Sequence, residues 1–136
     1  MTLALLQGVS VCSQSMEAGH LYAVLVNGGR NRLTNHERYW NDCAFLYRTL
    51  RQTFHIPKRN ITVLMSDGGK PEEDMLRDDG RGFKSSPIDL DGDNQSDVDY
   101  PATREMLVNA MFTLSRQLTT TLDRKSGSAG MPRPIS

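Results

Sequence analysis

The chain has 136 residues, a length that suits one domain with a single hydrophobic core. Its formal net charge is zero and 38% of its residues are hydrophobic, so its composition favours neither a nucleic-acid partner nor an anionic membrane. No stretch approaches the roughly 20 apolar residues that a membrane-spanning helix needs. The acidic residues are unevenly placed, because 11 of the 16 lie between Asp67 and Asp99. This acidic segment is a first indication of a cation site.

Residues 1–15 resemble the end of a secretory signal peptide. They are apolar and then small, they carry no charged side chain, and Ser13 and Ser15 are small enough for a cleavage site. The basic region that usually begins such a signal is missing, and a short buried strand or a ragged end is the alternative. We expect a signal-peptide-like remnant and a secreted or periplasmic protein.

The next part of the chain has the pattern of a strand, a helix and a second strand. Residues 21–26 are a continuous apolar run, which is typical of a central parallel strand. In residues 37–54 apolar side chains recur every three or four positions, which predicts an amphipathic helix capped by Asn35. Residues 61–65 predict the second strand. This order predicts parallel strands with a functional crevice at their carboxyl ends.

Beyond the second strand the pattern is less regular. Residues 70–100 predict a long polar loop, and a loop of that length usually has a function or is disordered. A second helix is predicted from Thr103, and residues 123–136, rich in Gly, Ser and Pro, predict a disordered tail. The apolar stripe expected on this helix consists of Met106, Ala110, Met111, Leu114 and Leu118. The fold class is therefore α/β, a parallel sheet core with flanking helices, and the sheet is incomplete because two strands do not finish such a domain.

An acidic loop within residues 70–100 has the spacing of a calcium site. Asp89, Asp91, Asp93 and Asp97 alternate along it, and Gln95 can offer its backbone carbonyl between the last two. Calcium needs six to eight oxygen ligands, and alternate residues of a tight loop can direct them to one point. The alternative is a solvated acidic turn held by hydrogen bonds between side chains and backbone. Mutual repulsion of the four carboxylates favours calcium as the cofactor.

Two residues of the first helix are further candidates. Arg38 lies near the expected crevice, and Asp42 follows it at the spacing of a surface ion pair, an interaction worth only about 0.3–0.5 kcal/mol. From spacing alone the ion pair is the simpler interpretation. Cys43 lies on the apolar stripe, so we expect a buried small side chain rather than a reactive thiol.

Four segments, residues 22–29, 35–42, 61–68 and 99–105, together resemble the start of a caspase-like domain of the legumain type. The resemblance covers about residues 20–120 and implies a mostly parallel sheet with helices on both faces. It implies peptide hydrolysis through a thioester acyl-enzyme, with a Cys nucleophile and a His base at the ends of later strands. It also implies that Arg38 lines the primary specificity pocket, where its guanidinium recognises an Asp or Asn side chain of the substrate.

The chain departs from this family in one major respect. No His follows His55 and no Cys follows Cys43, so the expected catalytic pair is absent. We therefore expect residues 20–122 to be the amino-terminal part of a caspase-like domain from a secreted cysteine endopeptidase, inactive alone, whose parent acts on peptides or proteins. The alternative is a non-catalytic calcium-dependent binding or adhesion module. An unfinished sheet also predicts self-association through an exposed strand edge.

Overall fold

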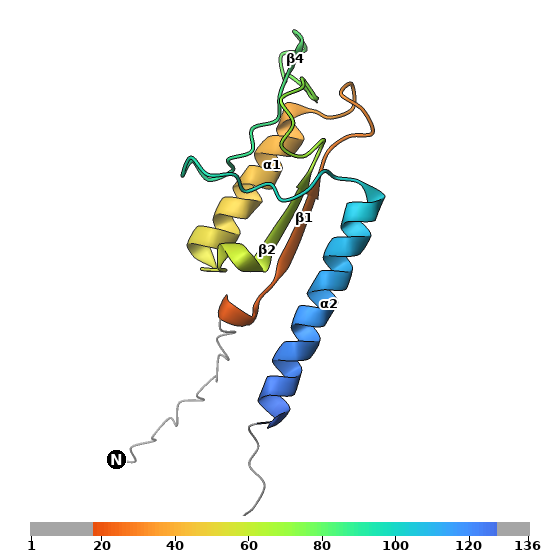
Figure 1. The fold of residues 1–136 in the computed structure, drawn as a ribbon. Coiled ribbons are helices and arrows are strands. Elements are labelled where there is room, and N and C mark those ends of the chain that lie inside the picture. Colours follow the sequence, from red (N-terminus) through yellow and green to blue (C-terminus); the bar gives the residue numbers. More distant parts are fainter. Residues whose placement is uncertain (1–17, 128–136) are drawn as a thin grey trace, which may run out of the picture.

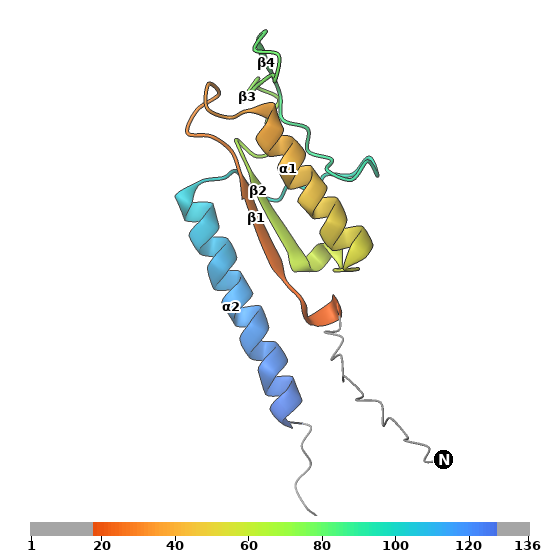
Figure 2. The ribbon, with the colours of Figure 1, turned by 180° about the vertical axis from the view of Figure 1, so that it is seen from behind.

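A computed structural model describes residues 18–127 and shows three layers (Figure 1). Strands β1 (Ala23–Asn27) and β2 (Ile61–Met65) pair in parallel and form the middle layer. Helices α1 (Glu37–Arg48) and α2 (Arg104–Gly127) lie on either side of the strands, as the view from behind also shows (Figure 2). The predicted fold class, an α/β arrangement with flanking helices and an incomplete sheet, is confirmed.

The two strands are joined in a fixed register that begins with Ala23 opposite Ile61 and ends with Asn27 opposite Met65. A short 3₁₀ turn, η3 (Lys58–Asn60), leads into β2. Within it the buried Asn60 side chain donates hydrogen bonds to the Gly19 and Leu21 carbonyl oxygens, so the starts of both strands are tied together. Gly19 lies within another short 3₁₀ turn, η1 (Ala18–His20), and Leu21 follows this turn.

The main core lies between the sheet and α1. The buried helix residues Cys43, Ala44 and Tyr47 pack against the strands, where Val63 and Met65 are fully buried. This confirms the predicted apolar stripe, because side chains three and four positions apart share one helix face. The helix continues as a π-helical turn, η2 (Thr49–Thr53). Its side chains are partly or fully exposed.

The outer edge of β2 is covered by the chain that leads into α2. The Met65 amide donates to the Tyr100 carbonyl oxygen at 3.0 Å, and the Asp99 amide donates to the Val63 carbonyl oxygen at 2.9 Å. The Asp99 carboxylate accepts a further hydrogen bond from the Val63 amide at 2.8 Å. Residues on both sides therefore satisfy the backbone of β2.

The outer edge of β1 is different. Within residues 18–127, β1 pairs with β2 alone, and Val26 is 53% exposed. On α2, Ala110 is buried, but Met111 and Leu118 of the predicted stripe are 51% and 43% exposed. Because Met106 and Ala110 approach Thr62 and Tyr100 on the β2 side, helix geometry directs Met111 and Leu118 toward the β1 side. The stripe is only partly buried because nothing in the described residues covers it beyond β1.

Residues 70–100 are more ordered than the sequence predicts. They contain a small antiparallel pair, β3 (Met75–Leu76) with β4 (Phe83–Lys84). The loop is fastened across α1, because Trp40 donates to the Pro87 carbonyl oxygen at 2.8 Å and Arg48 donates to the Leu90 carbonyl oxygen at 3.0 Å. Met75 and Leu90 are both buried. A few anchors of this kind hold a long polar loop in place.

The two predicted terminal segments lie largely beyond the described part of the chain. The signal-peptide-like remnant, residues 1–15, lies outside it, as do residues 128–136 of the predicted tail. Helix α2 ends at Gly127, later than the sequence pattern predicts. Hydroxyl groups of Ser115 and Thr119 donate to carbonyl oxygens of the preceding turn, so these two polar side chains are satisfied within the helix. Among the described residues, no helix is long and apolar enough to cross a membrane.

Candidate functional site

Asn35 connects three segments at the carboxyl ends of the strands. Its side-chain amide nitrogen donates to Ser66 Oγ at 2.7 Å and to the Asp74 carbonyl oxygen at 3.0 Å, and its backbone carbonyl oxygen accepts a hydrogen bond from the Leu76 amide at 2.8 Å. The prediction that Asn35 caps α1 is wrong, because the N-cap is His36, whose side chain makes no capping hydrogen bond. The Asn35 side chain instead bonds residues that are distant in sequence.

A cavity of about 370 Å³, which we call the strand-tip pocket, lies beside Asn35. This is where the sequence predicts a crevice, since both parallel strands end there. Its lining comes from the β1–α1 loop, the end of β2 and the following loop: Gly29, Arg30, Asn31, Arg32, Asn35, Ser66, Asp67 and Asp74. A Cβ atom on Gly29 would lie 2.3 Å from the Thr34 carbonyl carbon, so only glycine fits the tight path of this loop. Ser66 has a φ of +43°, a strained value for a residue with a side chain.

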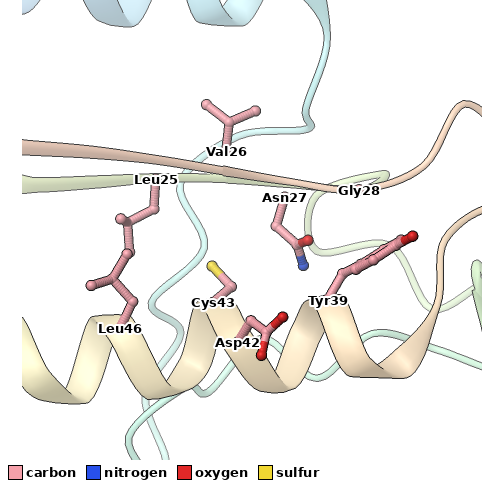
Figure 3. Close-up of a pocket in the computed structure, with 8 residues that line it drawn as sticks. All are labelled: Leu25, Val26, Asn27, Gly28, Tyr39, Asp42, Cys43 and Leu46. Atoms are coloured by element: carbon pink, nitrogen blue, oxygen red, sulfur yellow. The ribbon is translucent and has the colours of Figure 1, made fainter. Parts of the chain in front are cut away.

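A second hollow of about 320 Å³, the β1-edge groove, lies between the open edge of β1 and α1 (Figure 3). Its walls include Leu25, Leu46 and Cys43, and the Asn27 side chain points from the strand toward the helix. The Asn27 Nδ2 atom is buried and has no hydrogen-bond partner in the described residues. Burial raises the pKa of the Cys43 thiol to about 11, so it stays protonated near neutral pH. Cys43 is therefore a buried small side chain, as the sequence predicts, and a poor nucleophile.

Arg38 lies in the first turn of α1 and is exposed. Its guanidinium lies over the Tyr39 ring, 5.1 Å from the ring centroid, and Nη2 donates to Tyr39 Oη at 3.4 Å. Its backbone amide donates to Asp78 Oδ1 at 3.0 Å. Arg38 lines neither hollow itself, but Tyr39 lines the β1-edge groove. The arginine is therefore held at the rim of that groove.

The acidic loop brings three of its four predicted aspartates together. One carboxylate oxygen from each of Asp89, Asp91 and Asp97 lies within 4.8 Å of the others, so the group could hold a metal ion. Asp93 is not part of this group, and its carboxylate accepts a hydrogen bond from the Gln95 amide at 2.8 Å. Asp93 and Gln95 are both exposed.

Asp89 organises the turn of this loop. Its Oδ1 accepts the Gly92 amide at 2.7 Å, and its Oδ2 accepts the Asn94 amide at 2.8 Å. Donation from these amides, that of Gly92 first, lowers the pKa of Asp89. The carboxylate is therefore charged near neutral pH. These bonds are those expected of a solvated acidic turn, and they also leave the charge of Asp89 in place for a cation.

Asp97 is the buried member of the group, at 4% exposure. Its Oδ1 accepts hydrogen bonds from Tyr47 Oη at 2.7 Å and Lys58 Nζ at 2.8 Å, and its Oδ2 accepts the Leu90 amide at 2.8 Å. Burial, followed by the bond to Asp97, raises the pKa of Tyr47, which keeps the phenol protonated as a donor. The bond to Asp97 likewise raises the pKa of Lys58. A metal ion would share this carboxylate with the lysine.

Several of these contacts have no signal in the sequence. Tyr47 is predicted as part of an apolar stripe, but its bond to Asp97 spans 50 positions and no local pattern indicates it. Lys58 and Asp67 belong to no sequence motif that indicates a contact or a binding role. Only the position of Asp67 directly after a strand places it near the predicted crevice.

Comparison with protein-family models, with curated proteins and with solved structures gives no match for this chain. What the protein does is therefore inferred from its own residues.

Proposed function

We propose that the chain is the amino-terminal part of a secreted caspase/legumain-like cysteine endopeptidase, inactive by itself. The observation that carries this proposal is the half-finished sheet. The β2 edge is closed by residues 99–100, whereas no segment within residues 18–127 pairs with the outer edge of β1, and apolar side chains of both flanking helices stay exposed. A parallel sheet covered on both faces needs further strands on that side, and the resemblance places the catalytic His and Cys on such strands.

In this proposal Arg38 is the substrate-binding residue. Its guanidinium is exposed and held over Tyr39, at the rim of the β1-edge groove, so it can meet a carboxylate or amide side chain of a peptide. The buried Cys43 thiol supplies no nucleophile there, and no histidine lines the groove. The hydrolytic groups therefore have to come from residues outside this chain.

The alternative, a non-catalytic calcium-dependent binding module, is favoured by one observation. The Asp89, Asp91 and Asp97 group is fastened to α1 and to the start of β2 through Tyr47 and Lys58, and it shares no residue with the strand-tip pocket. A metal there would fix the long loop on the protein surface without taking part in hydrolysis. The coding sequence downstream of residue 136, translated in all frames, separates the two proposals. A strand ending in His-Gly and another ending in Cys support the peptidase, and their absence supports the module.

We further propose that the ion of the acidic loop is calcium. Carboxylates and backbone carbonyls are the hard oxygen ligands that calcium prefers, and the loop offers both.

Calcium should raise the melting temperature of the chain, because an ion that binds only the folded state stabilises it by mass action, about 2.7 kcal/mol at a hundredfold excess over Kd. Asp91→Asn should abolish most of this shift. Asp91 is the suitable position because its carboxylate accepts only a long hydrogen bond within the described residues, 3.3 Å from the Asp93 amide, so its structural role is small. The measurement is calorimetry with increasing calcium.

The matched control is Asp79→Asn, an exposed aspartate outside the acidic loop, which should leave the calcium shift intact. Lys58→Met should increase the shift, because it removes the ammonium that competes for Asp97. No shift at millimolar calcium, or equal shifts for Asp91→Asn and the unchanged protein, would remove the calcium proposal.

The open edge of β1 should make the isolated chain self-associate, because unpaired backbone groups flanked by apolar side chains recruit another strand. Val26→Lys places a charge beside this edge, where edge lysines hinder pairing, and should shift the chain toward the monomer. Val108→Lys makes the same change at a 59% exposed position of α2, opposite the buried Ala110, and should not. Sedimentation velocity over a range of protein concentrations measures the difference. A chain that stays monomeric at every concentration contradicts the expectation.

A further inference from the structure

The strand-tip pocket contains hydrogen-bond acceptors that lack donors. Asn35 is 2% exposed, and its Nδ2 atom makes its bonds to Ser66 and Asp74, whereas its Oδ1 atom accepts no hydrogen bond from any described residue. The Oδ1 atom of Asp67 is buried and equally without a donor. Buried polar atoms in folded proteins nearly always have a partner. Both residues line the same cavity, so a donor bound there would reach the two acceptors after a small movement of their side chains.

The Asn35 amide is oriented by its neighbours. Its Nδ2 atom faces two oxygen acceptors, Ser66 Oγ and the Asp74 carbonyl oxygen, so a flipped amide would set oxygen against oxygen. The unpaired atom is therefore the oxygen. Ser66 and Asp74 occupy the Nδ2 side of this amide, so a donor to Asn35 Oδ1 has to approach from the other side.

The pocket also carries two acidic side chains that are not ion-paired with any described residue. Asp67 and Asp74 both line it, and within residues 18–127 neither carboxylate makes an ion pair. The Asp74 carboxylate is held by Ser86, whose amide and hydroxyl donate to it at 2.7 and 2.8 Å. Burial, with Asp74 and Glu72 nearby, raises the pKa of Asp67, and the opposing effect of Lys70 only partly offsets this rise.

The nearby arginines do not remove this charge. The Arg32 guanidinium lies over the Phe83 ring, 4.5 Å from its centroid, rather than against Asp67. Arg30 and Arg32 also line the pocket but are exposed, whereas Asn35 is buried. The acceptors and the carboxylates therefore set the chemistry of the interior.

We propose that the strand-tip pocket binds an organic cation through several N–H donors, namely a primary ammonium or a guanidinium group. Such a group carries multiple donors on one positive centre and can satisfy Asn35 Oδ1 and Asp67 Oδ1 together. A cavity of about 370 Å³ is of the size that small-molecule sites have and is much larger than a bare metal ion needs. The proposal stands apart from the peptidase proposal, because binding of a cation requires no catalytic group.

The test is titration of the full chain, with its backbone and Asn35 side-chain amides followed by NMR. The probes are cadaverine for a free ammonium, agmatine for a free guanidinium, and a short lysine-containing peptide for the same group on a chain. We expect saturable shifts confined to the residues around Asn35 and Ser66 with at least one of these probes. Glutarate, a dianion of similar length, should produce none. Saturation with the peptide alone would identify a basic side chain as the ligand, and saturation with the free amines a small molecule.

Asp67→Asn tests the charge while keeping the shape of the side chain, and its circular dichroism spectrum should be unchanged. We expect affinity for the cations to fall at least tenfold. Glu73→Gln is the matched control, since it removes an exposed acidic charge next to Asp74 in sequence but outside the lining, and it should leave the affinity within about twofold because exposed charges are screened. The proposal is overturned by the absence of saturation with every cation, by saturation with glutarate, or by equal affinity in Asp67→Asn and the unchanged protein.

Discussion

The parallel pairing of β1 with β2 is the constraint on which the rest of this structure depends. Two strands that run in the same direction need a crossover, and α1 supplies it by packing Ala44 and Tyr47 on one face of the pair. The same pairing aligns the carboxyl ends of the strands, where the Ser66 amide donates to the Asn27 carbonyl oxygen at 2.8 Å. The strand-tip pocket exists because both strands end side by side and the chain turns away from the sheet after each of them.

The two edges of the sheet explain most of the exposed apolar surface. On the β2 side, residues 99–100 complete the backbone bonds and the loop before them covers α1. On the β1 side no described segment does this, and Val26, Leu46 and Met111 remain exposed on three different elements. A single cause, the incomplete sheet between the two helices, accounts for the exposure of all three side chains. This is also why the proposed function assigns the missing chemistry to further strands.

The acidic loop has the hydrogen bonds of a solvated turn and also the grouped carboxylates of a candidate metal site. Amides of the turn bond to Asp89, as in a solvated turn, while Asp91 and Asp97 are gathered close enough for a metal ion. Lys58 already neutralises part of the charge at Asp97. A metal ion bound there would therefore strengthen a loop that protein contacts have largely fixed. It would contribute to stability rather than to chemistry at the strand tips.

Periodicity in the sequence predicts the elements, and long-range polar contacts are what it misses. The second strand is predicted at its observed bounds, and the buried face of α1 follows from its three- and four-residue spacing, because both depend on local pattern. Asn35 stands where a helix cap is expected, but its side chain bonds Ser66, 31 positions away, and local sequence holds no record of that contact. The order within residues 70–100 likewise depends on anchors such as Trp40 with Pro87.

The central claim is that, within residues 18–127, β1 is hydrogen-bonded on one side alone. Amide hydrogen exchange, followed residue by residue at the lowest practicable protein concentration, tests it directly. The account predicts slow exchange along β2 and at the amides of β1 that face β2, with fast exchange at the amides of β1 that face outward. Equal protection of both sides of β1 at that concentration would contradict it, because some segment of the same chain would then have to complete the sheet.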